Sequence, residues 1–429
     1  MTHSTESPEV ARAPDRQIPV LRRLLCVALP FTSAYLLSEL FRNVNAVLAP
    51  VLRTEFHLAS TTMGFMTAAF LGALAGSQLF VGQALDRFGP KRVLVATLSL
   101  AALASILFAL AQNPATLVLG RFLIGLGLCA CWTGAYKANA LWWPRERLPL
   151  VNALTIGVAG IGSLAATAPA EWLLGRIDWR EMFFGLAAVA SGIALWIACA
   201  VPPAPTAAPD PGKFAGSRIG LRTIVAHPAF LCIMPVSALC QGAWIAYQGL
   251  WAGVWLREAI GLPPDAAAGA LMALALAVIL GQCLFGLLAD RLAQSDKALF
   301  HLTFALTAFF ILTQIAICAA SGTGQNLLWV CYGLFTSGPI LAYALLVRLL
   351  PQSVSGRAIS LLNLGAVLSG FIFQGGIGAA IDILLASGQD PATAQRGVLF
   401  GIVLCQAVAL ANMWLRRDRA IIPTGQTHA

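Results

Sequence analysis

A short polar segment that occurs twice constrains the fold of this chain more than any other feature. The first copy runs from Gly82 to Arg92 and the second from Gly286 to Arg291, each between two long apolar runs. At a shift of 204 positions the matching residues are Gln78 and Gln282, Gly82 and Gly286, Asp86 and Asp290, and Arg87 and Arg291. A polar hairpin repeated once in each half of an apolar chain is typical of a duplicated membrane protein.

The composition also favours a membrane environment. Of the 429 residues 59% are apolar and only 10% are charged, whereas a soluble protein carries about 25% charged residues. The net charge of +9 does not indicate nucleic-acid binding, because the basic residues form no patch or stripe along the chain. We therefore expect a lipid bilayer as the surrounding solvent and no nucleic-acid partner.

The ten cysteines predict neither a disulfide framework nor a metal site. All of them lie within or at the edge of apolar runs, where cysteine behaves as a small buried hydrophobe. Cys129 and Cys131 are closely spaced, but on a helix they would point about 200° apart and could not share a ligand. No metal and no cofactor is expected.

Twelve segments are long and apolar enough to cross a bilayer, which takes roughly 20 helical residues. The predicted spans are 24–50, 63–84, 92–112, 115–141, 148–175, 180–201, 228–256, 266–289, 297–319, 325–350, 356–385 and 394–415. With the amino terminus inside, the cytoplasmic segments hold 18 Lys and Arg residues and the outer loops five. This bias follows the positive-inside rule and predicts that both termini are cytoplasmic.

The spans divide the chain into two halves of six. Residues 202–226 form the one long interior loop, and their Pro, Ala and Gly content suits a flexible connector. The predicted divisions are a disordered cytoplasmic tail 1–21, a first six-helix bundle 22–201, a cytoplasmic linker 202–226, a second six-helix bundle 227–416 and a cytoplasmic tail 417–429.

The repeated segment resembles the loop motif that follows the second helix in the major facilitator superfamily. The residues that carry this resemblance are Gly82, Asp86, Arg87, Gly89, Lys91 and Arg92, with a weaker copy at Gly286, Asp290 and Arg291. The segment Arg121-Phe-Leu-Ile-Gly-Leu-Gly is similar to that family's fourth-helix motif. The resemblance extends over about residues 22–416 and implies an all-α membrane protein with 12 transmembrane helices in two pseudo-symmetric six-helix bundles.

The fifth span departs from two subgroups of that family. Residues 157–162 are glycine-rich but lack the Gly-Pro element of drug/proton antiporters, and the long glycine-asparagine pattern of nitrate porters is absent. The remaining resemblance is to bacterial carriers of organic anions, amino acids and peptides. It implies a secondary transporter.

The repeated loop has a physical reason to act as a gate. Gly82 lets two helices approach closely, and Asp86 can accept hydrogen bonds from Arg87 or from amides at a neighbouring helix start. Such a charge lock would join the halves in one state and release them in the other. The alternative is that these charges only set the topology.

Glu39 is the one carboxylate near the middle of a predicted span. It belongs to a polar stripe that covers about 100° of the helix circumference and consists of Thr32, Tyr35, Glu39, Arg42 and Asn43. Because Glu39 and Arg42 are three residues apart, they can pair. We expect Arg42 to bind a substrate anion beside Tyr35 and Asn43 while Glu39 takes up the coupling proton. The alternative is a permanent structural ion pair.

The seventh span, the counterpart of the first, carries an uncharged stripe. Its members are Gln241, Trp244, Gln248, Trp251 and Trp255. The absence of a second arginine argues against a multiply charged anion, and indole and amide groups suit an organic body. We expect Trp244, Gln248 and Trp251 to contact substrate; the alternative is helix packing.

Other ionisable residues in the spans receive weaker assignments. Arg121 is expected to tune the proton affinity of Glu39 or to bind substrate, with a helix-packing hydrogen bond as the alternative. Lys137 lies near a span end and is expected to snorkel to water. Glu171 and Asp382 lie toward the outer ends, where we expect ordinary water-exposed carboxylates; a role in a gate is the alternative.

These residues predict a secondary transporter of the bacterial inner membrane rather than an enzyme, since no nucleotide loop or nucleophile with its base is present. The expected activity is alternating-access symport of a small organic anion or zwitterion with a proton or another coupling ion, by a monomer. One alternative is multidrug or metabolite efflux by antiport. Another is a non-transporting receptor on a transporter scaffold.

Overall fold

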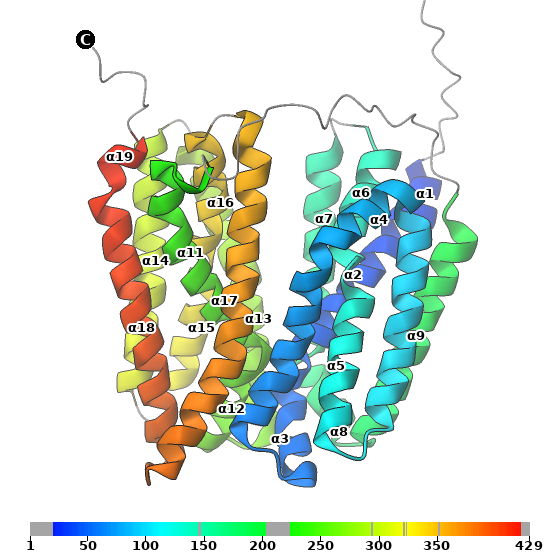
Figure 1. Cartoon of the computed structure of the whole chain (residues 1–429), viewed down its shortest axis with the longest axis horizontal. Coiled ribbons are helices and arrows are strands. Elements are labelled where there is room, and N and C mark those ends of the chain that lie inside the picture. The colour runs from blue at the N-terminus through cyan, green and yellow to red at the C-terminus, as the bar shows by residue number, and fades with distance from the viewer. Residues whose placement is uncertain are drawn as a thin grey trace, which may run out of the picture.

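The computed structural model describes residues 20–144, 147–202, 224–292, 295–320, 322, 324–350 and 352–421. Every regular element in these ranges is a helix. Most of the predicted linker 202–226 and of the predicted tails lies outside the described residues. The predicted all-α fold is confirmed, and Figure 1 shows two bundles of helices side by side.

The first bundle contains the helices of the amino-terminal half. They are α1 (Val20–Arg23), η1 (Leu24–Ala28), α2 (Leu29–Asn43), α3 (Asn45–Phe56), α4 (Ser60–Ala109), α5 (Pro114–Leu128), α6 (Cys131–Trp142), α7 (Leu148–Ala165), α8 (Ala168–Leu174) and α9 (Trp179–Ala200). Polar caps start several of them, because the first amides of a helix have no partner within it. Asn113 accepts from Thr116 N at α5, and Asp178 accepts from Arg180 N at α9.

The second bundle repeats this arrangement. Its helices are α11 (Pro228–Ala246), η3 (Tyr247–Trp251), α12 (Ala252–Val254), η4 (Trp255–Ala259), α13 (Pro264–Leu292), α14 (Asp296–Ala319), α15 (Gln325–Phe335), α16 (Ser337–Leu349), α17 (Gln352–Ala386), α18 (Pro391–Leu415) and α19 (Arg417–Ile421). Asp390 caps α18 by accepting from Ala392 N and Thr393 N. The π-helical turns η3 and η4 interrupt the seventh predicted span.

Eleven stretches of the described residues are long and apolar enough to cross a membrane, against twelve predicted spans. The predicted span 63–84 and most of the predicted span 92–112 lie in α4, whose backbone breaks at Gly89 with φ 77° and ψ 159°. This left-handed conformation is open to glycine without strain, and Pro90 then suits the first turn of the next helix. Figure 1 shows α4 turning back at one end of the molecule.

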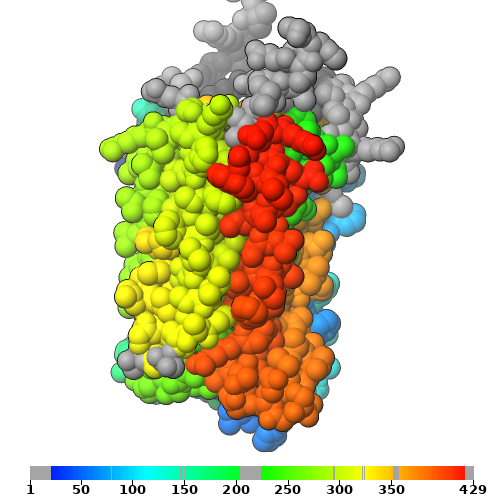
Figure 2. All heavy atoms as spheres, turned by 90° about the vertical axis from the view of Figure 1, so that its left-hand side faces the viewer, coloured from blue at the N-terminus to red at the C-terminus, as the bar shows by residue number. Residues whose placement is uncertain are grey.

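The surface of the second bundle suits contact with lipid. Figure 2 shows this surface, with α18 in red between α14 and α17, and α18 packs against both helices. The exposed apolar side chains on these three helices include Phe309, Leu312, Ile383, Leu404 and Val408. Lipid tails can solvate such side chains, so their exposure carries no penalty in a bilayer.

The two ends of the molecule differ in how the bundles meet. We call the end that carries α1 and α19 the terminal face and the opposite end, with α3, α8 and α12, the far face (Figure 1). Contacts between bundles join α4 to α17, α3 to η3 and α12, and α8 to α13. A Cβ on Gly378 would overlap Ser60 O, and one on Gly253 would overlap Ala46 O. The bundles therefore touch backbone to backbone toward the far face.

Candidate functional site

Glu39, Arg42 and Asn43 form a polar cluster at the end of α2. The Glu39 carboxylate accepts from the guanidinium of Arg42 and from Ser163 Oγ, the latter at 3.2 Å. Asn43 Nδ2 donates to Glu39 O at 2.9 Å and to Ser163 Oγ at 3.0 Å. The predicted pair is thus formed and is tied to α7 through Ser163.

A glycine on α7 allows this close approach. A Cβ on Gly162 would overlap Leu36 O and would lie 3.2 Å from Glu39 Cβ. Without that side chain the two helices pack closely, and the next residue, Ser163, reaches the carboxylate. Ser163 was not among the predicted site residues. The glycine-rich run at 157–162 is the signal that could have marked this helix as a close neighbour of Glu39.

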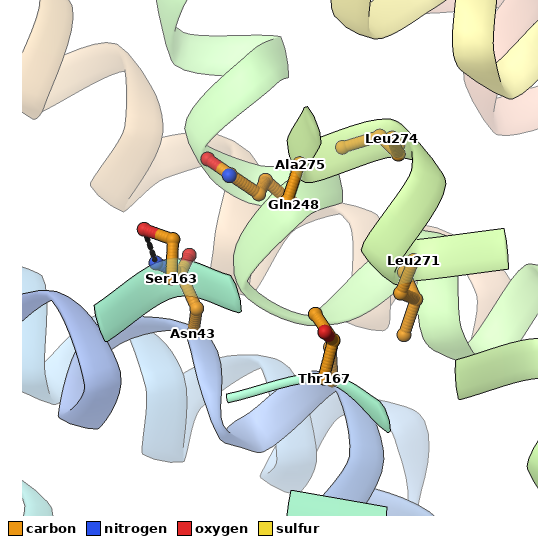
Figure 3. A pocket seen from close by; sticks show the side chains of 8 residues that line it. Asn43, Ser163, Thr167, Gln248, Leu271, Leu274 and Ala275 are labelled. Carbon is orange, nitrogen blue, oxygen red and sulfur yellow. Dashed lines mark hydrogen bonds between the residues drawn. The ribbon is translucent and has the colours of Figure 1, made fainter. Parts of the chain in front are cut away.

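A small cavity lies between the two bundles beside this cluster. It is lined by Asn43, Ala46, Ser163, Thr167, Gln248, Leu271, Leu274 and Ala275. Figure 3 shows Gln248 of η3 across the cavity from Asn43 and Ser163, with the bond between the latter two dashed. About 10 Å³ is open to the centre of a water molecule, which is room for roughly one water. Asn43 and Gln248 therefore line the same cavity, and all of its lining residues are uncharged.

The two charged members of the cluster differ in exposure. The Arg42 side chain is 30% exposed and that of Glu39 is 8% exposed. A carboxylate this enclosed needs a cationic partner or a proton, since an unpaired buried charge is costly. Arg42 is the more accessible group, so an incoming anion would meet the arginine first.

The aromatic stripe of the seventh span separates into different environments. Trp251 is only 1% exposed; its Nε1 donates to Gln374 O at 3.3 Å, and its ring lies against Gly64 of the first bundle. Trp255 is buried and donates to Gln325 Oε1 at 2.7 Å within its own bundle. Gln248 is the member of the stripe that lines the cavity. In this conformation Trp251 lies in the contact between the bundles.

Arg121 lies inside the first bundle. Its side chain is 1% exposed, its Nη1 donates to Phe41 O at 2.9 Å, and its guanidinium lies 5.1 Å from the Phe108 ring centre and 5.6 Å from that of Phe183. The described partners of Arg121 are thus a backbone carbonyl and two rings. This geometry matches the packing alternative and does not bring Arg121 to Glu39 in this conformation.

The repeated loop makes its described polar contacts within the first bundle. Asp86 pairs with Lys137 of α6, and Lys91 Nζ donates to Val201 O at 2.7 Å. The partner of Asp86 is therefore Lys137 rather than Arg87, and Lys137 is paired rather than snorkelling. A Cβ on Gly82 would meet no atom within 4 Å, so the close approach expected there is absent from this conformation.

The remaining loop residues lie in open positions. A Cβ on Gly286 would likewise meet no atom within 4 Å. The exposed charged residues of the two copies are Asp86, Arg87, Arg92, Asp290 and Arg291. Both copies therefore lie at the terminal face. The described bonds of Asp86 and Lys91 stay within the first bundle and do not connect it to the second.

The sequence missed a set of polar contacts between the bundles at the far face. Arg53 of α3 pairs with Glu258 of η4, and Glu171 of α8 pairs with Arg257 of η4 at 2.9 Å. Asp382 of α17 accepts from the first amides of α4. The expectation of ordinary water-exposed carboxylates at Glu171 and Asp382 is wrong, because each binds a group of the opposite bundle. Opposite charges at the outer span ends were the available signal, but their pairing depends on the tertiary fold.

A model of a known protein family covers most of this chain. The family model described as Major Facilitator Superfamily matches residues 31–374.

Three curated relatives carry transporter names. The "Uncharacterized transporter YybO" of Bacillus subtilis is 32% identical over 34% of each chain. The "Probable sulfoacetate transporter SauU" of Cupriavidus necator is 28% identical over 37% of each. The "Multidrug resistance protein MdtL" of Escherichia coli is 24% identical over 50% of this chain and 60% of that one. The matched regions thus span about a third of the first two relatives.

Solved structures share the whole fold. A bacterial homolog of the human lysosomal transporter Spinster, inward-facing and unoccupied, has a TM-score of 0.76 at 18% identity and covers 94% of this chain and 98% of that one. A D-xylose-proton symporter has a TM-score of 0.72 at 14% identity and covers 93% and 98%. At these identities the likeness shows the fold alone.

Proposed function

The chain belongs to the major facilitator superfamily, and from that premise we propose that it is a proton symporter for a small organic anion or zwitterion. The family and its relatives identify a transporter rather than an enzyme. The observation that carries the proposal is the buried Glu39 paired with the more accessible Arg42, next in sequence to Asn43, which lines the cavity between the bundles. A site between two halves of a duplicated membrane protein is where alternating access exposes a substrate to each side in turn.

The proposed orientation follows from the basic residues. With both termini cytoplasmic in a bacterial inner membrane, the far face is the outside. The cross-bundle pairs and Asp382 then support an outward side that is closed in this conformation. A closed outward side is also what the words inward-facing and unoccupied describe for the Spinster homolog, which has the same overall fold.

The proposed coupling follows from competition for Arg42. A substrate carboxylate or sulfonate would bind the guanidinium through charge-assisted hydrogen bonds and displace Glu39. The released Glu39 would take up a proton, because an unpaired carboxylate in this enclosed place is costly. Asn43, Ser163 and Gln248 would supply neutral hydrogen bonds to the rest of the solute. The relative named as a probable sulfoacetate transporter supports a small organic anion.

The test is transport by Glu39→Gln in proteoliposomes. Sulfoacetate is the first labelled probe, followed by small carboxylates and amino acids. Loss of the titrating group should abolish accumulation driven by a pH gradient and leave counterflow intact, since exchange needs no net proton movement. Glu181→Gln, at an exposed carboxylate of α9, is the matched control and should retain both activities. Unchanged accumulation by Glu39→Gln would overturn the coupling assignment.

Efflux is the second candidate function. Its support is the match to a relative named as a multidrug resistance protein over half of this chain. Arg42, next in sequence to the cavity-lining Asn43, disfavours lipophilic cations, because like charges repel. Expression that lowers ethidium accumulation in cells would favour efflux over anion symport.

A further inference from the structure

Two neighbouring residues of η4 bind the opposite bundle with opposite charges. Arg257 pairs with Glu171 on α8, and Glu258 pairs with Arg53 on α3. If η4 moved toward α3, Arg257 would approach Arg53, and if it moved toward α8, Glu258 would approach Glu171. The alternating charges on η4 therefore favour one alignment of the two bundles. The Glu171–Arg257 pair is the more buried of the two, and ion pairs gain strength as solvent is excluded.

Asp382 makes a third contact of a different kind. One carboxylate oxygen accepts from Ser60 N at 3.1 Å, and the other accepts from Thr61 N at 2.7 Å and Thr61 Oγ1 at 2.6 Å. These are the first amides of α4, whose own N-cap residue, Ala59, has no side chain that can cap. The cap of α4 is therefore supplied by α17 of the other bundle. Asp178 and Asp390 show the usual arrangement, because each caps the helix that it precedes.

The backbone contact beside Asp382 makes this cap depend on closure. Gly378 lies one helical turn before Asp382, and its lack of a side chain lets α17 touch Ser60 O. A hydrogen bond requires heavy-atom distances near 3 Å. If the bundles parted at this face, Asp382 would lose all three bonds together and the first amides of α4 would lose their cap.

We propose that Asp382, with the pairs Glu171–Arg257 and Arg53–Glu258, forms a latch that holds the far face shut. The proposal rests on the proposed function only in that transport requires this face to open. Asp382 is the strongest member, since its carboxylate accepts several charge-assisted bonds at a helix N-terminus. The two ion pairs contribute less and set the alignment.

The experiment measures access to the cavity from the far face. Thr167 lines the cavity and is 6% exposed. In a background with the native cysteines replaced, Thr167→Cys reports opening when intact cells are treated with a membrane-impermeant maleimide. Thr54→Cys, at an exposed position of α3, reports that the far face is outside. Neither readout requires substrate or a proton gradient, so the result is independent of the coupling by Glu39.

Asp382→Asn should raise the labelling rate of Thr167→Cys about tenfold, the effect expected from losing a charge-assisted hydrogen bond. Asp390→Asn is the matched control: it removes a capping carboxylate from the same bundle but touches only its own helix. Its labelling rate should equal that of the parent. Equal rates for Asp382→Asn and Asp390→Asn would overturn the latch.

Charge exchange gives a second measurement that does not depend on the folding of Asp382→Asn. Glu171→Arg and Arg257→Glu should each raise the labelling rate, because each places like charges together. The double variant Glu171→Arg/Arg257→Glu should return the rate to within about twofold of the parent, since it restores an ion pair. If the double variant labels as fast as the single variants, the pair does not hold the face closed and the latch is refuted.

Discussion

The far face and the terminal face of this protein both carry paired charges, yet the pairs have different consequences. At the far face Arg53 and Glu171 of the first bundle and Asp382 of the second each bind a group of the opposite bundle. At the terminal face Asp86 pairs with Lys137, and Asp296 pairs with Arg348, each within one bundle. A bond within a bundle survives when the bundles move, whereas a bond between bundles exists in one state only. A charge that pairs within one bundle therefore affects the stability of that bundle, whereas a charge that pairs across the bundles affects the balance between conformations.

The largest effect should come from glycines at the far face. In Gly378→Ala the new Cβ would overlap Ser60 O and prevent closure, whereas a Cβ on Gly375 of the same helix meets no atom within 4 Å. Overpacking costs about 1–3 kcal/mol, which corresponds to a rise of about fivefold to 150-fold in far-face labelling of Thr167→Cys. Gly375→Ala should label as the parent does. Similar rates for the two variants would show that the backbone contact is not what keeps this face closed.

A smaller effect of opposite sign is expected at the terminal face. In this conformation Asp86→Asn would remove only the bond to Lys137, which lies within the first bundle. In the outward-open state, where the charge lock expected at this loop would join the bundles, the same substitution would remove a bond between them. The balance should then shift away from the outward-open state and lower far-face labelling of Thr167→Cys about threefold, a change of less than 1 kcal/mol. Asp296→Asn, which breaks the other terminal-face pair, is the control and should have no effect. A rise with Asp86→Asn would argue against a lock formed by this loop.

The smallest effect should come from a far-face carboxylate that stays within one bundle. A hydrogen bond from Arg180 and another from Trp179 hold the pKa of Glu55 below its usual value. Because the folded-state pKa is lowered, this stabilisation is present above the unfolded pKa and is lost as the pH falls through the folded value. Glu55→Gln should cost less than about 1 kcal/mol near neutral pH, seen as a slightly lower melting temperature in detergent.

Two further results would sharpen that last comparison. The melting difference between Glu55→Gln and the parent should shrink as the pH approaches 4, since the parent carboxylate is then protonated in the unfolded chain. Far-face labelling of Thr167→Cys should not change, because Glu55 and Arg180 belong to the same bundle. A labelling change as large as that of Asp382→Asn would remove the distinction between pairs within and between bundles.

Residues of a single helix were the most predictable part of the candidate site. Glu39, Arg42 and Asn43 lie on one face of α2 because helical spacing fixes their directions, and the Glu39–Arg42 pair follows from a separation of three residues. The prediction that Gln248 faces the cavity also followed from helical spacing. Trp251 and Trp255 show the limit, since the same spacing cannot say which part of a face meets the cavity and which meets another helix.

The sequence by itself determined the spans, the duplication and the polar face of α2, because these depend on composition and on spacing within a few residues. Only the tertiary structure decided which charges join the bundles. The Arg53–Glu258 pair joins residues 205 positions apart, and Asp382 reaches Thr61 across 321. Such contacts depend on how whole helices pack and on which side of the protein is closed, and no local periodicity encodes either.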